Sequence, residues 1–151
     1  MPLWRIFSNP ATFSAQQREG LAKAITGLYT SPRLGLPAFY VNVIFVDVPD
    51  TGIWIGGEKK TNFVRIVAEQ IARQMPDPST PEGLAYHRAW LDTINEALKP
   101  WILDRSEIEW EFHIAETPRS LWRVQGIEPP PSHSEAEKKW MSENVAAPYK
   151  L

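Results

Sequence analysis

The second residue of the chain is a proline whose nitrogen could take part in acid–base chemistry. The sequence begins MPLWRIF, and a small second residue favours removal of Met1 during synthesis. Removal would leave Pro2 with a free secondary amine. An α-amino group titrates near about 7.7–8, and burial or neighbouring cations lower that pKa. A neutral amine near pH 7 is a competent general base, because the best catalytic pKa lies near the operating pH.

The same proline also has a purely structural interpretation. Proline has no N–H to give to a β-ladder, so in sheets it is confined to edges, bulges or the first residue of a strand. The segment LWRIFS (3–8) is a predicted strand, and Pro2 suits its start whether or not the amine reacts. Composition alone favours this second interpretation.

Other kinds of chemical site find little support in the sequence. It contains no cysteine, which excludes disulfides, thiolate metal sites and cysteine nucleophiles. His87, His113 and His133 lack the spacing of metal ligands, so we expect no metal. Gly56–Gly57 is not part of a G-x-G-x-x-G pattern and G-x-S-x-G is absent, so we predict neither a phosphate-binding loop nor a serine nucleophile, and no cofactor.

Length and composition indicate a single soluble domain, residues 1–151. The net charge is −2, whereas a nucleic-acid-binding protein would need a strongly basic face. No apolar run approaches the roughly 18 residues of a membrane span, and no secretory signal is visible. We therefore expect a cytoplasmic protein with neither nucleic acid nor a membrane as its partner.

The elements that would position Pro2 form a first β-α-β unit at about 2–57. The strand at 3–8 is followed by a helix at 14–29, which Ser14 can cap. A nearly continuous β-branched and aromatic run at 38–48 predicts a strand that is covered on both faces. A brief strand at 53–57 ends in the glycine pair.

A second β-α-β unit follows at about 61–115. It has a strand within 62–72 and a helix that Thr80–Pro81 begins. In the predicted strand at 107–114, apolar residues alternate strictly with polar ones, which are three glutamates and one histidine. This alternation predicts one apolar and one polar face.

Two such units predict an α/β fold with a four-stranded sheet and two helices on one face. Each unit is most simply a parallel strand pair with a right-handed crossover helix. The bare sheet faces of several copies could pack together in an oligomer. The tail, 116–151, holds a proline run and a short helix near 134–144, with Ser134 as its cap and Glu137 at the capping-box position.

The order of these elements, together with several short segments, resembles the tautomerase superfamily, in particular the branch of cis-3-chloroacrylic acid dehalogenase. The matching segments are Pro2, LAKAITGLY, VNVIF, IGG, the FV that opens the third long strand, and HIAETP. The tail segments LWRVQGIEPPP and SEAEKKWMSEN are similar to those of fungal oxalocrotonate-type tautomerases. The resemblance implies fused β-α-β repeats, a homotrimer and a catalytic amino-terminal proline that needs no cofactor.

The resemblance also implies site residues, several of which differ in type from those of the dehalogenase. Tyr29 stands where the dehalogenase has a histidine, and His113 stands where it has a tyrosine. Glu69 replaces the first arginine of a pair, and Arg73 lies near the second after a one-residue slip. Val124 occupies the position of the glutamate that activates water.

Four side chains are candidates for substrate binding. The planar guanidinium of Arg73 suits a carboxylate, and Arg123 could replace the missing first arginine. Trp122 could form a wall of the pocket. Asn42 lies inside a predicted strand, where its side chain needs a polar partner, and it could reach the site.

We interpret these residues as the site of a cofactor-independent tautomerase that acts on a small 2-oxo acid or related carboxylate. Neutral Pro2 would move a proton next to a carbonyl, and Arg73 with Arg123 would hold the carboxylate and steady the enolate. Tyr29 or His113 would donate a hydrogen bond to the carbonyl oxygen.

Two alternatives stay open. Hydration-type dehalogenation of a 3-haloacrylate would use protonated Pro2 as an acid, but Val124 cannot activate water as a glutamate would. A trimeric protein that kept the fold without catalysis is the other alternative, and the departures at Tyr29, Glu69 and Val124 motivate it.

Overall fold

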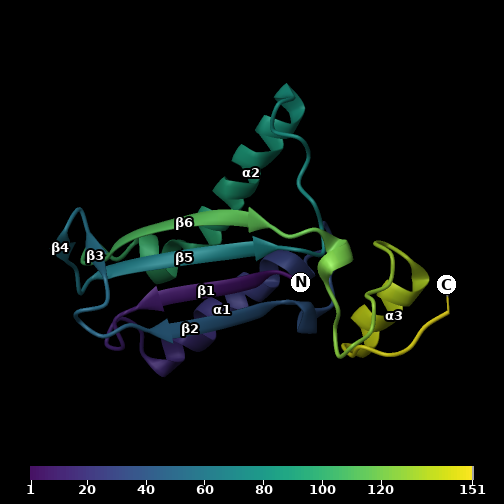
Figure 1. Ribbon diagram of the computed structural model, residues 1–151, viewed down its shortest axis with the longest axis horizontal. Coiled ribbons are helices and arrows are strands. Elements are labelled where there is room, and N and C mark those ends of the chain that lie inside the picture. Colours follow the sequence, from purple (N-terminus) through teal and green to yellow (C-terminus); the bar gives the residue numbers. More distant parts are fainter. Residues whose placement is uncertain (151) are drawn as a thin grey trace.

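Four strands form one mixed sheet in the computed structural model, which describes residues 1–150 (Figure 1). The sheet order is β2-β1-β5-β6, with β1 parallel to β2, β5 parallel to β6, and β1 antiparallel to β5. The prediction of two β-α-β units in a four-stranded sheet is confirmed. The bounds of the strands are β1 Leu3–Ser8, β2 Asn42–Asp47, β5 Phe63–Gln70 and β6 Glu109–Glu116.

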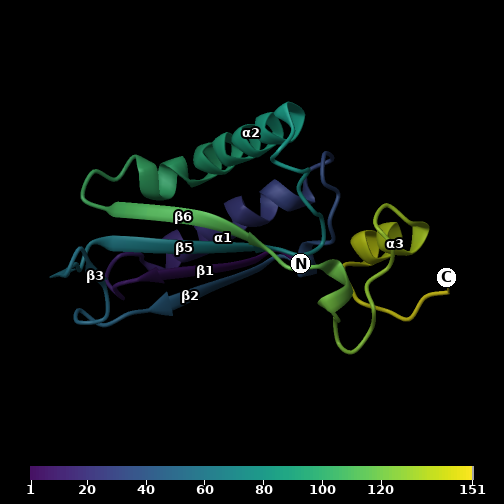
Figure 2. The same ribbon diagram turned by 45° about the horizontal axis from the view of Figure 1, so that its top comes forward.

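Both long helices lie on the same face of this sheet, as predicted (Figure 2). They are α1, Ala15–Thr30, and α2, Pro81–Leu98. The Ser14 hydroxyl accepts a hydrogen bond from the Gln17 N–H, and the Gln17 side-chain oxygen accepts one from the Ser14 N–H. The helix α1 therefore begins with a complete capping box. A single π-helical turn, Lys99–Leu103, extends α2 before the chain enters β6.

The main core lies between the helices and the sheet. Alternate residues of β1 and β5 point inward, because successive side chains of a strand face opposite sides. Burying each large aliphatic side chain stabilises the fold by about 1.5–3 kcal/mol. The fully buried residues of this layer include Trp4, Ile6, Leu21, Ile25, Val64, Ile66, Ile94 and Leu98.

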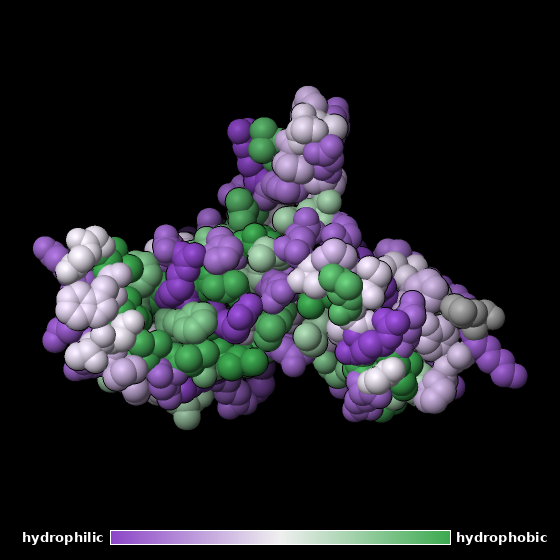
Figure 3. All heavy atoms as spheres, in the orientation of Figure 1, coloured by the Kyte–Doolittle hydropathy of each residue, from purple (hydrophilic) through white to green (hydrophobic). Residues whose placement is uncertain are grey.

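The opposite face of the sheet carries no helix (Figure 2). Figure 3 shows apolar patches on this face with polar groups between and around them. Ile44 of β2 is 48% exposed there, although it lies inside the sheet ladder. Arg5 pairs with Glu69 across β1 and β5 at 3.0 Å, and Arg65 pairs with Glu111 across β5 and β6.

Two segments of the first unit differ from their sequence-based prediction. The run at 38–48 forms a 3₁₀ turn, Ala38–Tyr40, before β2, and the residues of β2 are half-buried or exposed rather than covered on both faces. The reason is that β2 is an edge strand of a sheet with one bare face. The strand predicted at 53–57 is instead part of a separate hairpin, β3 Trp54–Ile55 and β4 Glu58–Lys59.

The tail lies beside the amino end of β1 (Figure 1). It contains a 3₁₀ turn, Arg119–Leu121, and the predicted short helix, α3 Glu135–Glu143. Trp140 of α3 is buried against Tyr40, and Asn144 accepts a hydrogen bond from the Phe39 N–H at 2.9 Å. Across residues 1–150 no helix has the length and apolar character that a membrane span requires.

Candidate active site

The amino terminus is built into the sheet. Pro2 is buried, and its carbonyl accepts a hydrogen bond from the Asn42 N–H at 2.9 Å. The ladder with β2 and β5 then begins at Leu3. Proline is suited to this position because it contributes the carbonyl to the ladder and needs no N–H.

The sheet topology brings distant parts of the chain to this end. Because β1 is antiparallel to β5, the start of β1 lies beside the end of β5, and the end of β6 lies next along the sheet. Arg73 follows β5 directly, and Arg119 follows β6. The tail then places Glu137 of α3 against both guanidinium groups. We call Arg73, Arg119 and Glu137 the charge cluster.

Glu137 is the centre of the charge cluster. Its side chain is only 3% exposed and forms a bidentate pair with Arg73, with Nη1–Oε1 at 3.1 Å and Nη2–Oε2 at 2.8 Å. The His133 N–H donates to Oε2 at 2.7 Å, and Arg119 Nη2 lies 3.6 Å from Oε1. A bidentate pair between guanidinium and carboxylate is among the strongest polar contacts in proteins.

Arg119 is held mainly by neutral groups. Its Nη1 donates to the Ala72 carbonyl at 2.8 Å, and its Nη2 donates to the Pro130 carbonyl. The guanidinium carbon lies 5.4 Å from the centre of the Trp122 ring, in a cation–π contact. The charge cluster therefore contains two positive charges and one negative charge.

The amino-terminal amine lies within reach of these charges. In the chain with Met1 present, burial is the main cause that lowers the pKa of the amine from 8.0 to about 4. The positive charges of Arg119 and Arg73 lower it further, and Glu137 opposes them. The amine is neutral at pH 7. The Pro2 nitrogen is one residue further into the same buried end of the chain.

Tyr40 adds an aromatic wall and a buried hydroxyl. Its ring is buried and packs edge-on against Trp122, with ring centres 4.7 Å apart. Burial, and secondarily the Glu137 charge, raise the pKa of Tyr40 to about 12, so the hydroxyl stays protonated. Among residues 1–150 its oxygen makes no hydrogen bond of standard geometry, although the Arg119 guanidinium lies beside it and opposes the rise in its pKa. A buried hydroxyl without a well-formed hydrogen bond is uncommon.

The predicted binding residues fall into two groups. Arg73 and Trp122 are in or against the charge cluster, and Asn42 adjoins it through its bonds to the Pro2 and Tyr40 carbonyls. Arg123 is not part of the cluster. Its half-exposed side chain pairs with Glu128 at 3.1 Å, because neighbouring residues of this extended segment point to opposite sides.

Tyr29 lies in the core rather than in an open pocket. Its hydroxyl accepts hydrogen bonds from Trp4 Nε1 and Gln70 Nε2, both at 3.0 Å. Burial raises the pKa of Tyr29 to about 12. A cavity of about 20 Å³ separates it from Arg73, which is room for little more than one water molecule. Within one chain, Tyr29 ties α1 to the ends of β1 and β5.

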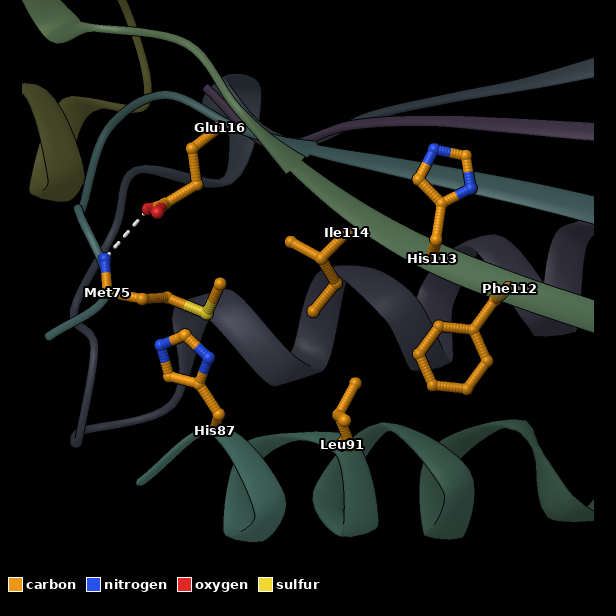
Figure 4. Close-up of a pocket in the computed structure, with 7 residues that line it drawn as sticks. All are labelled: Met75, His87, Leu91, Phe112, His113, Ile114 and Glu116. Atoms are coloured by element: carbon orange, nitrogen blue, oxygen red, sulfur yellow. Dashed lines mark hydrogen bonds between the residues drawn. The ribbon is translucent and has the colours of Figure 1, made fainter. Parts of the chain in front are cut away.

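His113 faces the bare side of the sheet. Its Nδ1 lies 2.6 Å from Arg65 Nη2. Figure 4 shows the imidazole on the opposite side of β6 from Phe112 and Ile114, and all three residues line a pocket of about 500 Å³ together with His87 of α2. Within a single chain, His113 therefore lies with Arg65 and apart from the charge cluster.

Two of the departures from the dehalogenase pattern, Glu69 and Val124, have local explanations. Glu69 is held by Arg5 and by the Thr117 hydroxyl at 2.6 Å, so its charge is compensated on the bare face. Val124 pairs with Ile127 across a tight turn in which Gln125 and Gly126 have positive φ. Neither residue belongs to the charge cluster.

Comparison with known proteins shows which family the chain belongs to. The sequence profile described as "putative oxalocrotonate tautomerase enzyme" matches residues 1–145. The chain belongs to this family. A search of curated proteins gives no match. The crystal structure of native RhCC from Rhodococcus jostii RHA1 is 42% identical, covers 97% of this chain and 99% of its own, and superposes with a TM-score of 0.87.

Two further structures define the relationship. A probable enzyme from the thermophilic fungus Aspergillus fumigatus is 36% identical over 99% of this chain and 98% of its own, with a TM-score of 0.86. A member of the cis-3-chloroacrylic acid dehalogenase family is 16% identical over 93% of this chain and 98% of its own, with a TM-score of 0.68. The second similarity concerns the fold alone. The predicted resemblance to the tautomerase superfamily is confirmed.

Proposed function

We propose that this tautomerase-family protein is a cofactor-independent tautomerase of a small 2-oxo acid or related carboxylate. Its general base would be the amine of Pro2 after removal of Met1. The observation that carries this proposal is the burial of the amino terminus beside two guanidinium groups, which favours a neutral amine. A neutral amine has a free electron pair and can accept a proton.

The reaction would need only proton movements. Pro2 nitrogen takes a proton from the carbon next to the substrate carbonyl, and the C–H electron pair forms the C=C bond of an enolate. Negative charge collects on the carbonyl oxygen, where Arg119 and the Tyr40 hydroxyl could stabilise it. Protonated Pro2 then returns the proton to another atom of the enolate, so substrate and product are isomers.

Hydration-type dehalogenation is a weaker candidate. It would use Pro2 as an acid, which requires a protonated amine near neutral pH. Burial and two adjacent cations oppose protonation, and Val124 provides no carboxylate to activate water. The same surroundings that suit a base are therefore unfavourable for this reaction.

We also propose that the active form is a homotrimer packed through the bare sheet face. Apolar side chains such as Ile44 would be buried there, and His113 would face a neighbouring subunit. Two neighbours of similar fold, 18% and 19% identical, are described as fused 4-OT asymmetric trimers. Sedimentation equilibrium should give about three times the 17.2 kDa chain mass, and Ile44→Lys should lower it. A wild-type monomer would contradict the trimer.

The proposed base can be tested in two steps. Intact mass spectrometry should show that Met1 is removed, because a Pro2 amide nitrogen cannot act as a base. Ketonisation of phenylenolpyruvate should then fall by about 100-fold or more in Pro2→Ala, within the usual range of general-base contributions. Pro10→Ala, at an exposed proline, is the matched control. Equal rates in the wild type and Pro2→Ala would reject the role.

A further inference from the structure

We propose that Glu137 is a specificity-determining residue, which neutralises one of the two guanidinium groups and so limits the ligand to a single negative charge. This inference rests on the proposed function, because it assumes that a carboxylate ligand binds beside the amino-terminal amine. The inference concerns which carboxylates bind, whereas the proposed role of Pro2 concerns the proton transfer that follows binding.

The contact between Glu137 and Arg73 has the geometry that a ligand carboxylate would adopt. Both terminal nitrogens of Arg73 are used by the two carboxylate oxygens, at 3.1 and 2.8 Å. The His133 N–H and the start of α3 fix the carboxylate from the other side. Because Glu137 is almost fully buried, its charge is poorly screened and acts strongly on nearby groups.

Arg119 shares the single Glu137 carboxylate with Arg73 and has no carboxylate of its own. Its short hydrogen bonds go to the Ala72 and Pro130 carbonyls, and Glu137 is 3.6 Å away. In the chain with Met1 present the amine is neutral at pH 7, and we expect the same of the Pro2 amine; the protonated Tyr40 hydroxyl adds no charge. The charge cluster therefore has a net charge of +1.

Neighbouring charges do not alter this balance. Arg5 and Glu69 compensate each other on the bare face at 3.0 Å. The Glu116 carboxylate is turned to the Met75 N–H at 2.8 Å, and Arg123 is paired with Glu128 in the tail.

One net positive charge suits a ligand with one carboxylate. A second carboxylate would lose water in the same buried region while facing Glu137, and burial of an uncompensated charge is costly. The uncharged part of a ligand could instead contact the rings of Tyr40 and Trp122, which are packed together. The site should therefore prefer an apolar monocarboxylate to a dicarboxylate of the same skeleton.

The test compares two non-reacting acids, cinnamate and 4-carboxycinnamate, by calorimetry on the full chain with Met1 removed. The wild type should bind the monoacid at least tenfold more tightly. Glu137→Gln, which removes only the charge, should shift this ratio at least tenfold toward the diacid. Glu135→Gln, on the same helix with a side chain that is 89% exposed, is the control and should keep the wild-type ratio.

Two further variants keep the test decisive if Glu137→Gln folds poorly. Glu137→Asp keeps the charge and should keep the preference for the monoacid. Arg119→Gln leaves the pair between Arg73 and Glu137 in place and should weaken monoacid binding at least tenfold. Thermal unfolding of each variant shows whether it is folded under the conditions of the titration.

Several results would overturn the inference. These are equal affinity of the wild type for both acids, an unchanged ratio in folded Glu137→Gln, or no binding of either acid by the wild type. The readout does not depend on turnover. If Pro2→Ala kept full activity while Glu137→Gln changed the ratio, the base would be misassigned and the charge selection would still hold.

Discussion

The starts of β1 and β5 occupy equivalent positions in the two β-α-β units, yet their surroundings differ. At the start of β5, Lys60 pairs with Glu109 at 2.9 Å, and the Asn62 side chain donates to the Glu107 carbonyl at 3.1 Å. These groups are exposed or nearly so. At the start of β1, Pro2 is buried beside the charge cluster.

The difference shows that equivalent positions of the repeated unit have different surroundings, because the segments that follow β5 and β6 bring charged groups to only one of them. Because β1 and β5 are antiparallel, the segments after β5 and β6 reach the start of β1. The corresponding neighbours of the β5 start are the loop after β2 and the hairpin of β3 and β4. Among residues 1–150, the tail is the one segment that carries a buried carboxylate, Glu137, to a strand start.

The largest stability effect should come from breaking the charge cluster. Arg73→Met leaves Glu137 buried without its bidentate partner, and loss of one partner from a buried ion pair costs about 3–5 kcal/mol. Urea unfolding should show this loss in the free energy of unfolding. A change below about 1 kcal/mol would mean that Glu137 reaches water easily and that the cluster is loose.

A smaller loss is expected from the hydrogen bonds beneath the site. Tyr29→Phe removes the acceptor of Trp4 Nε1 and Gln70 Nε2 and leaves two buried donors unpaired. The loss should be about 1–3 kcal/mol, the usual cost of leaving a buried hydrogen-bonding group unpaired, because the two neutral donors had shared one acceptor. Thermal unfolding should show the decrease, with Tyr86→Phe as the control. If Tyr29→Phe also abolished activity without unfolding, Tyr29 would have the catalytic role predicted from the sequence.

The low-pH limb of the pH profile of kcat/KM, called the acid limb, should shift in opposite directions in Arg119→Gln and Glu137→Gln. The neutral amine is the active form, so kcat/KM should fall as the pH falls through the amine pKa. In the chain with Met1 present, Arg119 lowers the pKa of the amine and Glu137 raises it, and we expect the same signs for the Pro2 amine. Arg119→Gln should therefore shift the acid limb to higher pH, and Glu137→Gln should shift it to lower pH. Shifts in the same direction would contradict the assigned charges.

The smallest effect should occur at the start of β5. Lys60→Met breaks an ion pair whose partner Glu109 is half-exposed, and such solvent-screened pairs contribute little to stability. Neither activity nor the position of the acid limb should change, because the pair lies at the opposite end of β5 from the amine. An altered acid limb in Lys60→Met would show that the two strand starts are coupled.

The sequence predicts the scaffold better than the site. Hydrophobic periodicity and helix caps give the two β-α-β units, the two helices on one face and the short helix α3. Those patterns do not determine how the units are oriented relative to each other, and the antiparallel junction of β1 and β5 decides which segments meet the amino terminus.

Individual residues show the same limit of prediction from sequence patterns. The resemblance pointed to Arg73 and the LWRV segment suggested Trp122, and both lie in or against the charge cluster, whereas Arg119, Glu137 and Tyr40 were not predicted as site residues. The assignment of these five residues to a binding site stays a proposal. The capping-box position gave Glu137 a sufficient local explanation. In the structure its N–H does bond Ser134 at 3.2 Å, but its carboxylate turns to Arg73 instead. A local pattern cannot reveal a partner 64 residues away in the chain.

The most direct test of the account is the pKa of the Pro2 nitrogen in the protein without Met1. A titration of ¹⁵N-proline-labelled protein by NMR would follow this nitrogen, since a free amine changes shift with protonation and the amide nitrogens of the other prolines do not. We predict a pKa clearly below the ordinary range of about 7.7–8 for an α-amine. A pKa above 8, or an amide signal from Pro2 because Met1 remains, would contradict the central claim.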